Sequence, residues 1–195
     1  DFAILDEPLP FLAGDPLPAD SQEVFSAPDF TADTATLFEH CVRALDSSLT
    51  IGSHGLPLFG TGDWNDGMNR VGAAGRGESV WMGWFLHATL LRFAPIADAR
   101  GEAATAAQWR KHAFALQQAI EREAWDGDWY RRGYYDDGTP LGSLSGDEFR
   151  IDSIAQSWGV IAGGGDSERP LRASAAVNAQ LVSRSDGLVQ LFTPA

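Results

Sequence analysis

The amino-acid sequence predicts an all-α fold built from helical hairpins. Apolar residues recur at spacings of three and four along several segments, and long glycine-rich loops separate those segments. Helices joined in this way favour an α/α arrangement over a parallel sheet. With 195 residues, the chain is long enough to bury a real core.

Residues 1–30 are expected to form an extended, proline-rich strap, followed by a helical region over residues 31–195. Proline lacks a backbone donor and interrupts regular helix, and the strap contains five prolines: Pro8, Pro10, Pro16, Pro18 and Pro28. The first helix is predicted from about Asp33 to Leu49 because apolar residues there repeat at helical spacing. Thr31 or Asp33 is its expected N-cap.

Four further helices are predicted over about 78–93 or 78–97, 102–125, 151–161 and 170–183. Glu78 is expected to open the first of these, where a carboxylate favours the helix dipole. Residues 129–135 have the aromatic and charged content of a short β-hairpin arm, whose turn is Asp136-Asp137-Gly138. The glycines at 163–165 are expected to end the fourth helix of the chain.

The loop from His54 to Val80, hereafter the signature loop, contains the most distinctive chemistry. Its centre reads Gly-Thr-Gly-Asp-Trp-Asn-Asp-Gly, so one tryptophan lies among carboxylate and amide side chains. An indole face stacks on the apolar face of a pyranose, and the polar groups bind its hydroxyls. A desolvated carboxylic acid there could protonate a glycosidic oxygen, and Asp63 and Asp66 are the two candidates. The alternative interpretation of this sequence is a turn with Asx caps.

The signature loop resembles the signature of glycoside hydrolase family 94, the inverting disaccharide and oligosaccharide phosphorylases. The matching stretch is Gly-Leu-Pro-Leu-Phe-Gly-Thr-Gly-Asp-Trp-Asn-Asp-Gly-Met-Asn-Arg-Val-Gly, followed by Gly-Glu-Ser-Val-Trp. Later stretches at 130–143, 150–158 and 187–194 fit the same pattern. Within the family, the chain is most similar to the phosphorylase-like C-terminal region of bacterial cyclic β-1,2-glucan synthases. The resemblance implies a partial (α/α)6 barrel with about half of the helices, because five helices cannot close a ring of twelve.

The resemblance also implies roles for individual residues. Asp66, the second aspartate of Asp-Trp-Asn-Asp, would be the general acid, while inorganic phosphate attacks the anomeric carbon and yields α-glucose 1-phosphate. An inverting hydrolase needs a second carboxylate as base, whereas phosphate is already a negatively charged nucleophile. Trp64 would form a wall of the sugar subsite, with hydroxyl contacts from Asp63 and Asn65. Asp63 could equally hold the loop by accepting backbone N–H groups.

Arginine roles remain open at two positions. Arg150 either reaches a sugar hydroxyl or phosphate, or supplies ordinary charge at the start of a helix. Arg70 either pairs with Asp63 or Glu78 and so fixes the signature loop, which is the favoured role, or faces the sugar. On the helix predicted over 151–161, Gln156 and Trp158 lie two residues apart, so at most one of them can point into the site. Trp158 is expected in the core.

The composition limits the classes of molecule that the protein is expected to bind. The net charge of -13 disfavours nucleic acid and anionic membrane surfaces, and phosphate would need local positive charge against this background. The four histidines lack metal-ligand spacing, so no metal site is expected, and no cofactor is expected apart from inorganic phosphate as co-substrate. The expected partners are a β-glucan oligosaccharide or polysaccharide and phosphate.

The chain does not begin with methionine and is interpreted as a piece of a longer polypeptide, incomplete at both ends of its helical region. The remainder of that polypeptide is an expected partner, and the resemblance implies the cytoplasmic face of a bacterial inner membrane. Exposed helix faces could instead make the piece a homodimer. Two other functions stay open: an inverting β-glucan hydrolase with Glu148 or Asp152 as base, and a non-catalytic glucan-binding module.

Overall fold

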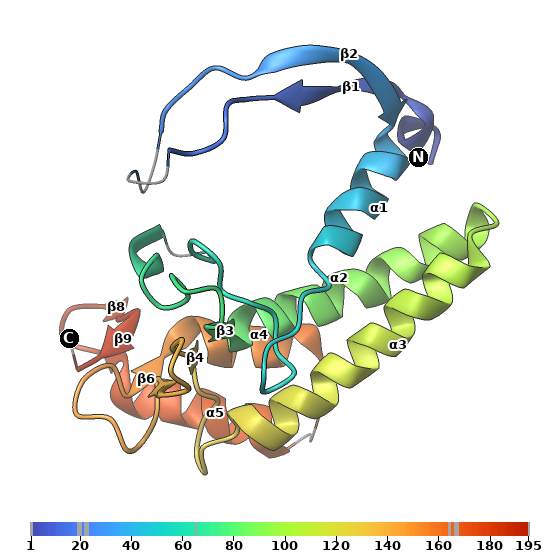
Figure 1. Cartoon of the computed structure of the whole chain (residues 1–195). Coiled ribbons are helices and arrows are strands. Elements are labelled where there is room, and N and C mark those ends of the chain that lie inside the picture. The colour runs from blue at the N-terminus through green and yellow to red at the C-terminus, as the bar shows by residue number, and fades with distance from the viewer. Residues whose placement is uncertain are drawn as a thin grey trace. The chain divides into compact units, whose positions relative to one another are not determined.

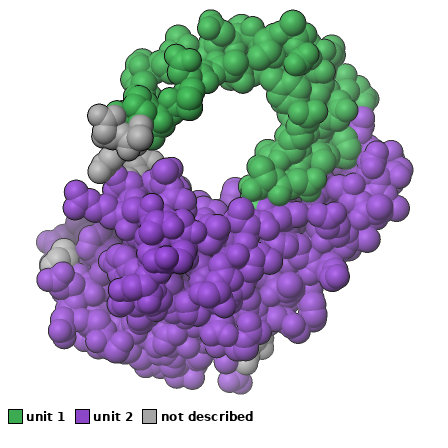
Figure 2. All heavy atoms as spheres, in the orientation of Figure 1, with its two compact units in different colours: residues 1–48 green, residues 49–195 purple. Residues whose placement is uncertain are grey.

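A computed structural model describes residues 2–18, 21, 24–64, 66–163, 165 and 168–194, without the side chain of Asp66. The chain divides into two compact units, residues 1–48 and residues 49–195 (Figure 2). The sequence placed its division earlier, after residue 30. The first helix belongs with the strands that precede it, which moves the boundary to the end of that helix.

The first unit is an antiparallel β-hairpin that leads directly into a helix (Figure 1). Strand β1 (Pro8–Ala13) pairs with β2 (Asp29–Thr36), and the first residue of β1 lies opposite the last residue of β2. A 3-10 turn, η1 (Ala3–Asp6), precedes β1, and α1 (Leu37–Ser47) follows β2. Each strand of a two-stranded sheet has a free edge, which is where proline is tolerated. The part of the proline-rich segment that contains Pro8 and Pro10 is therefore extended and paired, whereas Pro16, Pro18 and Pro28 lie outside the two strands.

The first helix begins later than the periodicity predicted. Residues 31–36 belong to β2, so neither Thr31 nor Asp33 caps the helix. Thr36 is the N-cap: its hydroxyl accepts from the Glu39 N–H at 3.2 Å, and the Glu39 carboxylate accepts from the Thr36 N–H at 2.8 Å. This reciprocal capping box satisfies two helix-end donors. Pairing with β1, a non-local contact, holds residues 31–36 out of the helix.

The second unit is mainly helical. Helices α2 (Val80–Ala99) and α3 (Ala103–Ala119) lie side by side as a hairpin (Figure 1), and α3 continues into one π-helical turn, η3 (Ile120–Ala124). Helix α4 (Ser153–Ala162) packs against α2, and α5 (Glu168–Gln180) packs against α4. These helices confirm the periodicity to within a few residues. Among the helices in the described ranges, none combines the length and apolar character that a membrane crossing requires.

Small antiparallel sheets join the loops of this unit, so the chain is not purely α-helical. The three-stranded sheet has the order β3-β4-β5, and two further strand pairs are β6 with β9 and β7 with β8. Their bounds are β3 (Glu78–Ser79), β4 (Gly133–Tyr134), β5 (Pro140–Leu141), β6 (Ile151–Asp152), β7 (Val182–Ser183), β8 (Leu188–Val189) and β9 (Phe192–Thr193). The hairpin β4/β5 turns at Asp136, Asp137 and Gly138, which confirms that prediction.

The core of the second unit lies between the helices and the loops at the start of α2 and α4. Trp84 of α2, Tyr130 and Ile151 are fully buried members of one cluster. The rings of Trp84 and Tyr130 meet edge to face, with centroids 5.5 Å apart. Because Tyr130 and Ile151 lie next to polar residues in these loops, the core supports the loop residues directly.

Gly133 in β4 lies too close to β3 to carry a side chain. A Cβ atom added there would lie 2.3 Å from the Glu78 carbonyl oxygen. We expect Gly133→Ala to lower the free energy of unfolding by about 1 to 3 kcal/mol, because β4 must move away from β3. Urea denaturation measures the change. Gly14→Ala is the control, since no atom lies within 4 Å of a Cβ there, and equal stability of both variants would contradict the close approach.

Candidate active site

The signature loop is closed at its base by backbone pairing. The Phe59 N–H donates to the Gly77 carbonyl at 2.7 Å, and the Ser79 N–H donates to the Pro57 carbonyl at 2.9 Å. These bonds bring the two ends of the loop together. Residues 60–76 therefore form a single excursion whose entry and exit are fixed.

Asp63, inside this excursion, is buried against Arg132. Arg132 Nη1 and Nη2 donate to the two carboxylate oxygens of Asp63 at 2.7 and 2.6 Å, and both side chains are 0% exposed. The Ser79 hydroxyl donates to the same carboxylate at 2.6 Å. A bidentate arginine fixes both the position and the plane of a carboxylate. This burial argues against the predicted contact of Asp63 with a sugar hydroxyl and favours the alternative, in which Asp63 holds the loop.

The same guanidinium connects the signature loop to two helix N-termini. Arg132 Nη1 lies 3.2 Å from the Ser79 hydroxyl, and Arg132 Nε lies 3.6 Å from Asp152 Oδ2. Ser79 is the N-cap of α2 and Asp152 is the N-cap of α4, each accepting from backbone N–H groups of the first turn. We refer to Asp63, Ser79, Arg132 and Asp152 as the Arg132 cluster. It joins one loop to two helices.

Burial raises the pKa of Asp152 to about 6, even though Arg132 and the first-turn N–H groups of α4 lower it. The Asp63 carboxylate, which shares Arg132, raises it further. Removing a carboxylate from water therefore outweighs the attraction of a guanidinium that already binds another carboxylate. Asp152 takes up a proton more readily than an exposed aspartate does.

The other residues predicted for the site follow Asp63 directly. The Trp64 side chain is 56% exposed, so its indole ring is accessible for stacking. Asp66 begins the 3-10 turn η2 (Asp66–Met68). The side chain of Asp66 and the whole of Asn65 lie outside the description. Because Arg132 fixes Asp63, the backbone that carries Asp66 starts from an anchored point.

Arg150 lies at the entry to β6 and is half-buried. Its N–H donates to the Thr193 carbonyl and its carbonyl accepts from the Trp129 indole, both at 2.9 Å. Its Nε is buried and makes no hydrogen bond within the described part of the chain. The backbone of Arg150 is therefore fixed, and its contact with sugar or phosphate stays a prediction.

A cavity of about 310 Å³ borders η2, and we call it the loop cavity. Its lining includes Gly67, Met68, Arg70, Tyr135, Glu148, Phe149 and Phe192. The cavity thus combines apolar and aromatic walls with charged side chains of both signs, which is typical of a small-ligand site. Over the described ranges, no three His, Cys, Asp or Glu side chains are grouped so that they could hold a metal ion.

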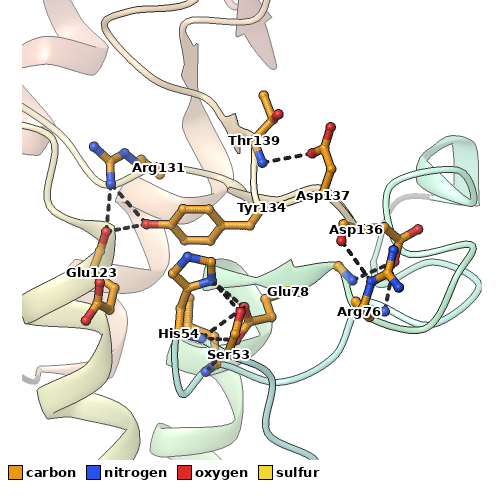
Figure 3. Close-up of polar contacts among 12 residues, drawn as sticks. Ser53, His54, Arg76, Glu78, Glu123, Arg131, Tyr134, Asp136, Asp137 and Thr139 are labelled. Atoms are coloured by element: carbon orange, nitrogen blue, oxygen red, sulfur yellow. Dashed lines mark hydrogen bonds and ion pairs between the residues drawn. The ribbon is translucent and has the colours of Figure 1, made fainter.

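Glu78 holds the start of the signature loop from the inside (Figure 3). It is buried in β3 and accepts hydrogen bonds from the backbone N–H groups of His54 and Leu56 at 3.0 and 3.1 Å. It also pairs with the His54 ring, which stacks on Tyr134 with centroids 3.8 Å apart. The prediction that Glu78 opens α2 is wrong, because Glu78 lies in β3 and Ser79 caps the helix.

Arg70 does not have the role that the sequence suggested. Asp63 pairs with Arg132, and Glu78 contacts the His54 ring, so other side chains occupy both of its proposed partners. Arg70 instead forms part of the wall of the loop cavity.

Gln156 and Trp158 both have structural roles. The buried Gln156 amide exchanges hydrogen bonds with the Tyr130 backbone at 2.8 and 2.7 Å, which anchors the segment that carries Arg132. Trp158 packs against the core cluster and meets Phe85 edge to face at 5.1 Å. The expectation that Trp158 belongs to the core is confirmed.

The role of Arg132 is not apparent from the sequence. Arg131 and Arg132 are adjacent and chemically identical, but an extended backbone points neighbouring side chains to opposite sides. Arg131 binds Asp126, whereas Arg132 binds Asp63. The one local signal is an arginine pair in an extended, aromatic-rich segment, and it does not say which arginine faces inward.

Comparisons with known proteins agree with the sequence pattern. The family model described as "Glycosyl hydrolase 94 superfamily, catalytic domain" matches residues 19–195. The chain is 53% identical to the cyclic beta-(1,2)-glucan synthase NdvB of Rhizobium meliloti (strain 1021), over 98% of the chain and 7% of that protein. Two proteins of Paenibacillus borealis are also similar. They are a 3-O-beta-D-glucopyranosyl-beta-D-glucuronide phosphorylase, 36% identical over 76% of the chain and 19% of that protein, and a solabiose phosphorylase, 32% identical over 94% and 22%. The chain spans less than a quarter of the length of each of these relatives.

The raised pKa of Asp152 makes stability depend on pH. The folded state binds this proton more tightly than the unfolded state, so stability is lost as the pH rises from about 4 through about 6, on the order of 2 to 3 kcal/mol. Asp152→Asn keeps an N-capping side chain but removes the titration. In urea denaturation, we expect the free energy of unfolding of the variant to rise relative to that of the native protein by this amount between pH 4 and pH 7. A difference that is independent of pH would contradict the assignment.

Removal of Arg132 leaves the Asp63 carboxylate buried and without its cation. We expect Arg132→Met to lower the free energy of unfolding by about 3 to 5 kcal/mol. The double variant Arg132→Met/Asp63→Leu should recover much of this loss in urea denaturation, because it no longer buries that charge. Arg131→Met is the control at the neighbouring position, with a smaller expected loss because Arg131 is 25% exposed. Equal stability of the single and double variants would contradict the pairing.

Proposed function

Because the chain belongs to the glycosyl hydrolase 94 superfamily, we propose that it forms part of a glycosyltransferase domain of the glycoside phosphorylase type. The match of residues 19–195 to the catalytic domain of the family carries this proposal. The two similar proteins of Paenibacillus borealis are both named as phosphorylases. The proposed activity is that of the whole domain to which the matched residues correspond.

The proposed substrate is β-1,2-glucan. Its support is the 53% identity to a protein named as a cyclic beta-(1,2)-glucan synthase. In such a synthase, phosphorolysis would set the length of the linear glucan before the ring is closed. The location that follows from this proposal is the cytoplasmic face of the bacterial inner membrane.

In the proposed reaction, Asp66 donates its proton to the glycosidic oxygen as the bond from that oxygen to the anomeric carbon breaks. An oxygen of inorganic phosphate attacks the anomeric carbon from the opposite face, so a β-linkage gives α-glucose 1-phosphate. Phosphate supplies the negative charge of the nucleophile, and no carboxylate base is required. Trp64 would stack on the sugar, and Asn65 and Arg150 would bind hydroxyl groups or phosphate.

The Arg132 cluster would position this chemistry. A general acid must lie within hydrogen-bond reach of the leaving oxygen, and small displacements of a reacting group are costly. Asp63 lies three residues before Asp66 in the sequence, and Arg132 binds both of its oxygens. Asp63 and Arg132 are therefore proposed as positioning residues and not as groups that contact the sugar.

The fold proposed for the domain is an (α/α)6 barrel, of which these helices form a part. Its support is the α2/α3 hairpin together with the packing of α4 on α2. Helices α2 and α4 both direct their N-termini to the Arg132 cluster, which suits inner helices of such a barrel. Helices α3 and α5 would then belong to the outer layer.

An inverting hydrolase on the same scaffold is the second candidate, and one observation favours it. Glu148 lines the loop cavity, where a carboxylate base could activate water. Asp152, the other base that the sequence suggested, is buried against Arg132 and caps α4, so it does not suit that role. A requirement for phosphate separates the two reactions.

The test uses the full-length protein with linear β-1,2-glucan, with and without inorganic phosphate, and measures α-glucose 1-phosphate. We expect product only with phosphate, and a loss of about 100-fold or more in Asp66→Asn, because a positioned acid contributes at least that much. Asp147→Asn, at an exposed position, is the matched control. Free glucose that forms without phosphate and disappears in Glu148→Gln would support the hydrolase instead. If the protein binds glucan but forms no product under either condition, the result would support a non-catalytic glucan-binding module.

A further inference from the structure

The geometry points to a second saccharide subsite, in a cavity beside the β4/β5 turn that binds a neutral pyranose unit of the substrate. This inference rests on the proposed glucan function. The cavity has a volume of about 430 Å³, and we call it the turn cavity. Its lining includes Ile51, Ser53, Leu58, Gly75, Arg76, Tyr135, Asp136 and Asp137.

Tyr135 lines both the turn cavity and the loop cavity beside η2. One residue thus lines both cavities, so the two cavities are neighbours. Tyr135 is 38% exposed, although its neighbour Tyr134 is buried. An exposed aromatic residue shared by two cavities is suited to stack on one unit of an oligosaccharide whose next unit occupies the neighbouring cavity.

The walls of the turn cavity offer the mixture of surfaces that a sugar requires. Ile51 and Leu58 provide apolar surface for the ring faces. Ser53, Arg76 and Asp137 provide donors and acceptors for hydroxyl groups. These side chains come from the segment before the signature loop, from the loop itself and from the β4/β5 turn. The site would thus form only in the folded chain.

The polar wall is built in advance by Asp136 (Figure 3). Its carboxylate accepts from the backbone N–H groups of Ala74, Arg76 and Gly77 at 2.7, 2.8 and 2.9 Å. Arg76 Nε donates in return to the Asp136 carbonyl at 3.0 Å. The end of the signature loop is therefore fastened to the β4/β5 turn. A wall that is already ordered reduces the entropy lost when a ligand binds.

Charge favours a neutral ligand over an anion in the turn cavity. Arg76 contributes one positive charge, whereas Asp136 and Asp137 contribute two negative charges. The pKa of Asp136 is lowered, first by the Ala74 N–H, and that of Asp137 is lowered, first by the Thr139 N–H, so both are ionised at neutral pH. The local net charge is therefore negative and would repel phosphate or an acidic sugar. A glucan unit carries no charge and avoids this repulsion.

The test is binding of linear β-1,2-glucan oligosaccharides of increasing length to the full-length protein, measured by titration calorimetry, with inorganic phosphate alone as a second probe. We expect affinity to rise with length in the native protein and this rise to shrink roughly two- to tenfold in Tyr135→Ala. Tyr135→Phe should keep most of the increase in affinity with length, because the aromatic ring is retained. Ile51→Trp, at an exposed position, should block longer ligands from a different side of the cavity. Phe114→Ala is the matched control, because Phe114 is 59% exposed on α3.

The same length dependence in Tyr135→Ala, Ile51→Trp and the native protein would overturn the subsite, and so would phosphate binding that is lost in Arg76→Gln. Calorimetry does not require turnover, so failure to form α-glucose 1-phosphate would refute the proposed reaction while the subsite is still measured. If α-glucose 1-phosphate forms but the affinity depends on glucan length in the same way in the variants and the native protein, the subsite alone is refuted. Failure to bind any glucan would refute both.

Discussion

The fully buried guanidinium of Arg132 is the interaction on which the candidate site depends. It binds both oxygens of Asp63 and faces Asp152, so one cation serves two buried carboxylates. Burial of charge is costly unless every partner is present, and loss of one partner leaves an uncompensated ion. The raised pKa of Asp152 indicates that its attraction to Arg132 does not fully offset the cost of burying its charge. Such an arrangement holds its members in one geometry because every alternative leaves a charge without a partner.

This cluster also explains how a glycine-rich loop acquires a definite shape. Glycines alone would give the signature loop many conformations. Backbone pairing closes its base, Arg132 fixes Asp63 near its middle, and Asp136 fixes residues 74–77 near its end. Buried Glu78 holds the first residues of the loop through the backbone N–H groups of His54 and Leu56. The loop is therefore ordered by polar contacts from several elements, which is what a positioned catalytic group requires.

Local and global charge act at different ranges in this protein. The chain carries a net charge of -13, yet its buried carboxylates each have specific donors. The global charge governs encounters with other macromolecules, whereas the local donors decide which side chains face a ligand. The two cavities beside Tyr135 follow the local rule, since their charged walls are set by the Asp136 turn and by the residues after η2.

Local pattern alone determined the helices α2 to α5, the β4/β5 turn and the position of the Asp-Trp-Asn-Asp loop, because each depends on residues close together in the sequence. It was wrong about the start of α1, where pairing with β1 overrides helical periodicity. It left open whether Asp63 contacts the sugar or holds the loop, because nothing near Asp63 reveals that Arg132 lies opposite. Only the tertiary structure decided that, since the two residues are 69 positions apart and Arg131 is an equally good local candidate. Periodicity is local information, but the pairing of buried charges is set by the packing of the whole unit.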